Sequence, residues 1–325
     1  MTLMLLAVVA AASIFPASGS VADALGVLTM LMIGLLFFLH GAKLSREAII
    51  AGATHWRLHL LVLLSTFALF PLLAFLLKPA ILAMLTPELF LGVLFLCMLP
   101  STVQSSIAFT AAARGNVPAA ICSASVSSLL GIFLTPLLVS LAMPGGNQAG
   151  SSLDSALAIV YQLLLPFIAG QVARRWIGAW IDGHKSLVRF VDQGSILLVV
   201  YAAFSAAVVQ GLWSRVSAPQ LFNLVIVCAV LLAIVMGLMV WLARRLGFGK
   251  EDEITIVFCG SKKSLASGIP LAHVLIPAAS LSMVVLPLML FHQIQLLVCA
   301  VIAGRYARRA EVAPPTALAT PADRA

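Results

Sequence analysis

Long apolar runs separated by short polar segments make up the chain as far as about Arg309. Because a membrane-spanning helix needs about 20 mostly apolar residues, this pattern predicts ten spans, with soft boundaries at 1–17, 26–43, 57–78, 88–113, 117–143, 155–173, 189–213, 219–243, 253–275 and 279–304. The sequence therefore predicts an all-α integral membrane protein. Its transmembrane domain covers 1–309, and a Pro- and Ala-rich tail over 310–325 is expected to be disordered in the cytoplasm.

The first apolar run has two interpretations. Its apolar core and the small residues after it are typical of a secretory signal peptide, but it lacks a positively charged start. A retained first helix fits better, because the topology derived below needs a span there.

The composition supports the membrane interpretation. Hydrophobic residues make up 62% of the chain and charged residues 9%, and the mean hydropathy is +1.13. A soluble domain carries roughly 25% charged residues. The net charge of +8 does not indicate a nucleic-acid partner, because the basic residues are spread over short loops.

The basic residues predict the orientation. Those in the loops after the even-numbered spans, and in the C-terminal flank, are Lys43, Arg46, Arg57, Arg114, Arg174, Arg175, Lys185, Arg189, Arg244, Arg245, Lys250, Arg305, Arg308 and Arg309, whereas the opposite side holds only Lys78 and Arg215. The positive-inside rule then places these loops and both termini in the cytoplasm. We expect a multi-pass protein of the cytoplasmic (inner) membrane.

Ten spans with this orientation divide into five plus five, with repeat one over about 1–143 and repeat two over about 155–309. Since each half has an odd number of spans, the second half enters the membrane from the opposite side. This inverted-topology repeat is a common transporter architecture.

Both halves have an interruption in the corresponding span. In the fourth span, Pro100 is followed by Ser101, Thr102, Gln104, Ser105 and Ser106; in the ninth, Gly260 is followed by Ser261, Lys262, Lys263, Ser264, Ser267, Gly268 and Pro270. Paired interruptions in the two halves are a sequence pointer to a binding site at the membrane midplane. The alternative is that such residues serve helix packing, as Gly, Ser and Pro often do in membranes.

Three other polar groups are candidates for the same site. Ser123 and Ser127 lie four residues apart on one helix face, directed either toward the break in the fourth span or back to their own helix. His292 lies midway along the tenth span, where an ionisable group suggests function, although a bond to a neighbouring helix would also explain it. His40 is close to a loop and is expected to be interfacial.

No feature of the sequence indicates a metal, a cofactor or catalysis. The cysteines (97, 122, 228, 259 and 299) fall within apolar runs without metal-binding spacing. No P-loop, HExxH or GxSxG motif occurs, so energy coupling would be electrochemical. The function classes to weigh are a secondary transporter, a membrane regulator that retains the same fold and, least favoured, an intramembrane enzyme.

The two interrupted segments, MLPSTVQSSIAFTAAARGNV and FCGSKKSLASGIP, resemble the bile acid:sodium symporter superfamily, and in particular its SBF-like branch. The resemblance extends to about Arg309. It implies a panel of spans 1, 2, 6 and 7, a core of spans 3–5 and 8–10, and broken helices 4 and 9 that cross beside a cavity for an organic anion. The substrate would move by alternating access.

The chain departs from the sodium-coupled members of that superfamily. The resemblance puts their acidic residue of span nine at Phe258, their Gln-Asn pair at Lys262 and Lys263, and their hydroxyl ligands of span five at Ala120 and Ala124. The usual sodium sites are therefore not expected, although coupling to sodium or to protons both stay open.

The two lysines need compensation at mid-membrane. A lysine there costs about 3 kcal/mol on insertion scales, and all 11 acidic residues lie in or near predicted loops. We expect one ammonium, that of Lys262, to occupy free carbonyls of a broken helix at the place where relatives bind sodium. Lys263 or His292 would then face the anion or carry a proton, since burial disfavours the charged form of an amine. The alternative is that both lysines reach an interface.

Overall fold

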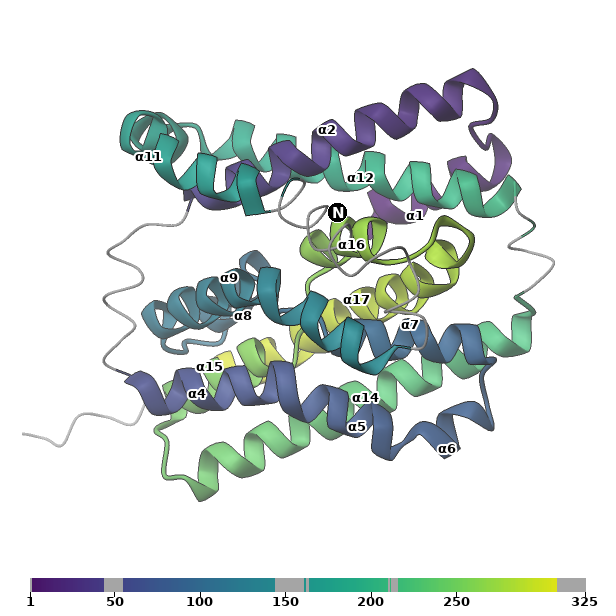
Figure 1. The fold of residues 1–325 in the computed structure, drawn as a ribbon. Helices are drawn as coiled ribbons and strands as arrows, with labels where there is room; N and C mark the ends of the chain where they lie inside the picture. The colour runs from purple at the N-terminus through teal and green to yellow at the C-terminus, as the bar shows by residue number, and fades with distance from the viewer. Residues whose placement is uncertain are drawn as a thin grey trace, which may run out of the picture.

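The computed structural model describes residues 2–43, 55–143, 161, 164–209, 211 and 216–308, and within these ranges the regular structure is helical. The predicted tail over 310–325, the start of the sixth predicted span and the end of the seventh lie outside the described residues. Figure 1 shows the helices running roughly parallel to one long axis.

Six helical stretches of the described chain are long and apolar enough to cross a membrane: Ser20–Lys43, Trp56–Leu76, Val117–Ala142, Ser186–Ala206, Ala218–Arg245 and Ser280–Ala307. Two of the other predicted spans are broken in the middle, so neither half has the required length. The described residues thus support a multi-pass membrane protein with six candidate spans, and the two broken spans agree with the interruptions predicted in spans 4 and 9.

Four helices form one layer, at the top of Figure 1. Helix α2 (Ser20–Lys43) packs along α11 (Leu165–Gly183) and α12 (Lys185–Val209), and α1 (Thr2–Ile14) packs on α12. The first apolar run is therefore part of the helical bundle. Helix α11 continues to Gly183, through the two arginines that the sequence places in a loop after residue 173; the predicted end of that span is wrong by about three turns.

The α2–α11 contact depends on glycines. A Cβ added at Gly41 would overlap the carbonyl oxygen of Phe167, and one added at Gly170 would overlap that of Phe38. Small residues let membrane helices approach to backbone contact. These two glycines therefore allow the short distance between the backbones of α2 and α11.

The second group of helices contains the two broken ones and the helices that pack around them. Its elements are α4 (Trp56–Leu64), η2 (Ser65–Leu69), α5 (Phe70–Leu76), α6 (Lys78–Leu82), α7 (Pro87–Cys97), α8 (Gln104–Ala112), α9 (Val117–Ala142), α14 (Ala218–Arg245), α15 (Lys250–Gly260), α16 (Leu265–Leu275) and α17 (Ala278–Ala307). Helix α17 packs on α7, α8, α14 and α16, and both α16 and α17 also contact α12. The two groups of helices thus meet along α12.

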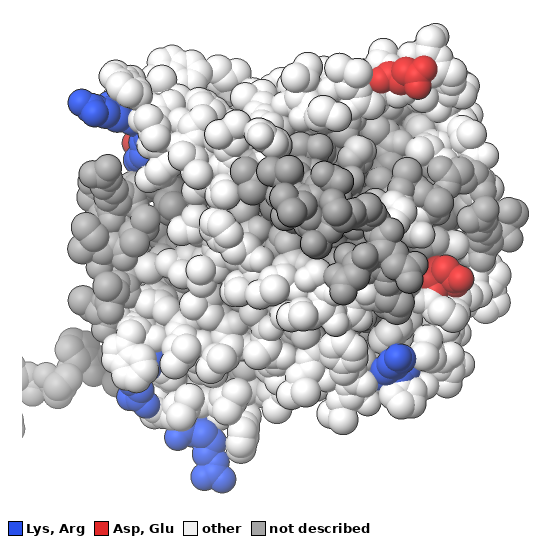
Figure 2. All heavy atoms as spheres, in the orientation of Figure 1, with Lys and Arg blue, Asp and Glu red and all other residues white. Residues whose placement is uncertain are grey.

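Charged side chains on the described part of the visible face lie toward the two ends of the helices, and the surface between them is uncharged (Figure 2). Such a band is what a lipid-facing surface requires, because a charge in the hydrocarbon region is costly. The distribution agrees with a chain that crosses the membrane several times.

Candidate functional site

The first break separates α7 from α8. Helix α7 ends at Cys97, before Pro100, which has no N–H to continue a helical ladder. Neighbouring side chains satisfy the exposed backbone: Ser127 Oγ accepts from the Ser101 N–H at 3.0 Å, and Thr135 Oγ1 donates to the Met98 carbonyl at 2.8 Å. The break is therefore held by α9, where both of those side chains lie.

The second break separates α15 from α16 and follows Gly260. Ser264 caps α16, because its hydroxyl accepts from the Ser267 N–H at 3.1 Å. The Gln295 amide of α17 bonds Lys263 twice, accepting from its N–H at 2.9 Å and donating to its carbonyl at 2.9 Å. Irregular backbone at membrane depth needs such internal partners, and Gln295 provides them for Lys263.

The two breaks also bond to each other. Ser101 Oγ donates to the Cys259 carbonyl at 2.6 Å, Ser106 Oγ donates to the Phe258 carbonyl at 3.0 Å, and the Ser264 N–H donates to the Pro100 carbonyl at 2.9 Å. The serines that the sequence places after each break therefore join two segments more than 150 residues apart in the chain.

Lys263 fills a pocket of carbonyl oxygens. Its ammonium donates to the backbone carbonyls of Thr66, Cys97 and Leu99 at 2.6, 2.7 and 2.8 Å, and it lies 4.2 Å from the centre of the Phe70 ring. The side chain is completely buried. An ammonium has three donors, and here all three are used.

Two of these carbonyls, those of Thr66 and Cys97, are free for identifiable reasons. In η2 the Phe70 N–H bonds the Ser65 carbonyl, so the Thr66 carbonyl would bond residue 71, which is a proline without an N–H. The Cys97 carbonyl lies at the end of α7, and the N–H four residues later, on Ser101, is taken by Ser127. Lys263 thus replaces the missing donors.

Lys262 has a different environment although it is the next residue. It is also completely buried, but its hydrogen bond to Ser105 Oγ is 3.4 Å long. The ammonium lies 4.2 Å from the centre of the Phe109 ring and 5.6 Å from that of Phe258. Cation–π contacts of this kind compensate part of the desolvation of a cation.

The expected positions of the two lysines are therefore exchanged. It is Lys263, and not Lys262, that lies against the free carbonyls of a broken helix. Neither lysine reaches an interface, since both side chains are buried. Adjacent residues after a helix end point in different directions, and sequence spacing alone does not say which of the two faces the carbonyls.

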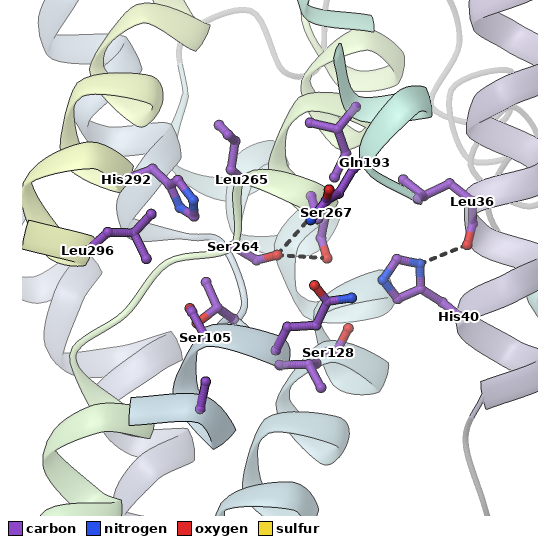
Figure 3. A pocket seen from close by; sticks show the side chains of 16 residues that line it. Leu36, His40, Ser105, Ser128, Gln193, Ser264, Leu265, Ser267, His292 and Leu296 are labelled. Carbon is purple, nitrogen blue, oxygen red and sulfur yellow. Dashed lines mark hydrogen bonds between the residues drawn. The ribbon is translucent and has the colours of Figure 1, made fainter. Parts of the chain in front are cut away.

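A cavity of about 370 Å³ lies beside the two breaks (Figure 3). Its walls come from α2, α8, α9, α12, α16 and α17, so it lies where the two groups of helices face each other. Hydroxyl, amide and imidazole groups provide its polar surface, and Leu36, Ala108, Ile196, Leu265 and Leu296 are among its apolar residues. Ligand sites of roughly 300–1,000 Å³ commonly combine apolar walls with a few polar groups.

Five of the twelve predicted site residues line this cavity: Thr102, Gln104, Ser105, Ser264 and His292. The other seven do not. Ser101 and Ser106 join the breaks, Ser127 bonds the Ser101 N–H, and Ser261 bonds back to its own helix at Val257. Ser123 bonds His59 of α4 at 2.6 Å, and the side chains of Lys262 and Lys263 are completely buried and do not line the cavity.

Several lining residues were not predicted. Ser128, Gln193 and Ser267 complete the polar surface, and His40, expected at an interface, lies across the cavity from His292 in Figure 3. His40 Nδ1 donates to the Leu36 carbonyl at 2.7 Å. Of these residues, only Ser267 could have been found from the sequence, because it belongs to the polar cluster after the second break. The others line the cavity because their helices pack there.

The cavity lining combines neutral polar groups with two helix N-termini. Among the described residues that line it, none is Asp or Glu. The first turns of α8 and α16 both border it, and helix N-termini carry partial positive charge. Gln295 Nε2 can only donate, so His292 Nδ1 accepts that bond at 2.9 Å, which leaves the proton of a neutral ring on Nε2.

No group of three or more His, Cys, Asp or Glu that could hold a metal occurs in the described part of the chain, and the five cysteines are free and buried.

Helical spans, two mid-membrane breaks that bond to each other and a cavity beside them define the class of multi-pass membrane transporters with discontinuous helices. The chain belongs to the SBF-like CPA transporter family, whose model matches residues 1–308. The resemblance drawn from the two interrupted motifs is confirmed, and the family is one of transporters rather than enzymes.

Three relatives match the chain over most of its length, and two of them carry transporter names. The chain is 58% identical over 313 residues to "Putative symporter YfeH" of Escherichia coli, covering 95% of this chain and 93% of the relative. An uncharacterized protein of Pseudomonas aeruginosa is 65% identical over 308 residues, or 95% and 92% of the two chains. Sodium/bile acid cotransporter 7 of Xenopus tropicalis is 28% identical over 310 residues, or 91% and 88%.

Proposed function

We propose that the protein is a secondary active transporter of a small organic anion. The cavity beside the two breaks carries this proposal, because it combines donors and two helix N-termini with apolar walls and has no carboxylate among its described lining residues. The polar groups would bind the negative end of the substrate, and the leucine and isoleucine side chains would contact its apolar body.

The substrate would move by alternating access. In this proposal, α1, α2, α11 and α12 form a panel, and the helices around the crossed breaks form a core that rocks against it. The cavity is consistent with such motion, since its walls come from both groups. Its panel residues, such as His40 near the end of α2 and Gln193 near the start of α12, lie toward the Lys43 end of the bundle.

The chain would consist of a five-plus-five inverted repeat over about 1–143 and 155–309, and each of the two groups would contain helices from both halves. The corresponding breaks after Cys97 and after Gly260 support this organisation. The basic loops support a location in the inner membrane with both termini in the cytoplasm, as the positive-inside rule requires.

Coupling is proposed not to use the usual sodium sites. Lys263 already places a cation against three backbone carbonyls, which are oxygen ligands that a sodium ion would otherwise take. The ammonium is covalently attached and completely buried. Transport would then not require sodium, in contrast to the sodium cotransport that the name of the Xenopus relative indicates for that protein.

Uptake into proteoliposomes tests this function. The purified protein is screened by thermal shift against a panel of carboxylates and sulfonates, because a ligand of the folded state raises its apparent stability. Uptake of stabilising anions is then measured with sodium or potassium as the only monovalent cation. Equal uptake in both salts is expected, and strict dependence on sodium would contradict the proposal for Lys263.

The alternative is a membrane regulator that keeps the fold but moves little. Binding without flux for every stabilising anion, in protein that remains folded, would favour it.

A further inference from the structure

The adjacent lysines differ in how completely their charges are compensated. Lys263 has three short hydrogen bonds to carbonyls, whereas Lys262 has one long bond to Ser105 and two aromatic rings. No ion pair with a carboxylate is formed by either lysine within the described chain. An ammonium removed from water needs compensation to stay charged, and hydrogen bonds compensate the ammonium of Lys262 less completely than that of Lys263.

The titratable groups around Lys262 do not provide a counter-charge. They are the thiols of Cys259 on α15 and Cys299 on α17, together with the His292 ring on α17. The elements that contact its ammonium directly, α8 and α15, contribute Ser105, Phe109 and Phe258. A negative charge that compensates Lys262 must therefore come from beyond the residues that contact its ammonium.

A chain of hydroxyls leads from Lys262 to the cavity wall. Ser106 donates to the Phe258 carbonyl, so the bond of 3.0 Å between Ser106 and Thr102 must be donated by Thr102. Ser105 in turn donates to Thr102 at 2.8 Å, which leaves its oxygen to accept from Lys262. Ser105 and Thr102 both line the cavity, so the ammonium lies one hydroxyl behind a bound anion.

Building on the proposed transport function, we propose that Lys262 carries the coupling proton, so that the anion and one proton are transported together. An anion in the cavity would supply the charge that the protonated Lys262 lacks. By thermodynamic linkage, protonation of Lys262 then raises the affinity for the anion by the same factor as the anion raises the affinity for the proton. Anion affinity should increase as the pH falls.

The proton balance follows from the cycle. On the uptake side, the neutral amine takes a proton from water and the anion binds. On the release side, the anion leaves, the N–H bond breaks, the electron pair stays on the nitrogen and the proton goes to water in the cavity. For a monovalent anion the step carries no net charge. A pH gradient should therefore drive accumulation, and a membrane potential should have little effect.

The first test needs no substrate. The chain has six lysines, at positions 43, 78, 185, 250, 262 and 263, so labelling of lysine with ¹³C at Cε gives few NMR signals, and Lys262→Arg assigns one of them. We expect the Lys262 signal to change with pH within the physiological range while the Lys263 signal stays constant. If the chemical shift of Lys262 remained that of a charged amine across this pH range, the proposal would be overturned.

The second test uses proteoliposomes with radiolabelled benzoate and taurocholate as probes and a pH indicator trapped inside. In the wild type, an inward pH gradient should raise uptake several-fold, proton entry should accompany the anion, and a protonophore should abolish accumulation. Lys262→Arg keeps a charge that cannot be released, so it should lose gradient-driven uptake but retain exchange of internal for external anion.

The outcomes separate this inference from the function on which it rests. Wild-type flux that ignores pH, or full gradient-driven uptake by Lys262→Arg, would overturn the role of Lys262 while leaving transport intact. Absence of both uptake and exchange in folded wild-type protein, combined with an NMR signal of Lys262 that does change with pH, would count against transport of these anions and leave the titration of Lys262 standing.

Discussion

Single residues determine how the irregular backbone at the two breaks is satisfied. Lys263 donates to three backbone carbonyls, two of which lack a helical donor because of Pro71 and the end of α7. Gln295 supplies both a donor and an acceptor to the Lys263 backbone. Buried polar groups that lose such partners are costly. The stability of the junction should therefore depend on these side chains individually.

Replacing Lys263 should cost far more stability than replacing Lys262. In Lys263→Met three carbonyls lose their partner, at about 1–3 kcal/mol each, and removal of a buried charge offsets part of this. We expect a net loss of roughly 3 kcal/mol for Lys263→Met and about 1 kcal/mol or less for Lys262→Met. Thermal unfolding in detergent measures both, and equal shifts would contradict the different environments of the two ammonium groups.

Gln295→Leu should destabilise the protein by about 1–3 kcal/mol, because it leaves the N–H and the carbonyl of Lys263 without their partners. Gln293→Leu is the matched control on the same helix, since the side-chain amide oxygen of Gln293 (Oε1) has no hydrogen-bond partner among the described residues. The control should change the melting temperature little. A larger effect at position 293 than at 295 would show that Gln295 does not stabilise the break.

At the scale of elements, close packing of α2 on α11 holds one layer of the molecule together. The backbone of each helix approaches a glycine of the other, with Gly41 against Phe167 and Gly170 against Phe38. Contacts of this kind leave no room for a methyl group. The pairing of these two helices therefore depends on positions that carry no polar or charged group.

Gly170→Ala should destabilise the helix pair by about 1–3 kcal/mol, the usual cost of forcing a methyl group into a packed contact. Gly26→Ala in α2 is the control, because a Cβ there meets nothing within 4 Å. Alanine favours a helix over glycine by up to about 1 kcal/mol, so the control should be neutral or slightly more stable. Thermal unfolding compares them, and a tolerated Gly170→Ala would contradict the close approach.

At the scale of the whole molecule, the cavity lies between the two groups of helices and next to both breaks. If the groups rock against each other, the same lining residue must become accessible from each side of the membrane in turn. The native cysteines are all buried, so a cysteine introduced in the cavity can be followed by its labelling.

Ala108→Cys should react with a membrane-impermeant thiol reagent from the cytoplasmic side in the conformation described here, and from the opposite side in the other. The cavity residue Ala108 lies outside the hydroxyl chain, so its replacement leaves that chain intact. Ala124→Cys, which is buried in α9, is the control and should stay unlabelled. Labelling from one side only, with and without a bound anion or a pH gradient, would argue against alternating access.

The sequence by itself determined the membrane class, the family and where the helices break. The family follows from the resemblance of the two interrupted motifs. The membrane class and the breaks follow from local chemistry: apolar runs of spanning length, and Pro100 or Gly260 followed by polar residues, which cannot continue a helix without outside partners. Five cavity residues adjacent to the breaks or on the tenth span were predicted for the same reason.

Only the tertiary structure decided which side chain meets which partner. Lys263 rather than Lys262 binds the carbonyls, because one of those carbonyls belongs to Thr66, almost 200 residues away, and is free only through the nearby Pro71. His40, Ser128 and Gln193 reach the cavity because α2, α9 and α12 pack there. Sequence spacing describes neighbours along one helix, whereas these contacts depend on how separate helices are placed and rotated against each other.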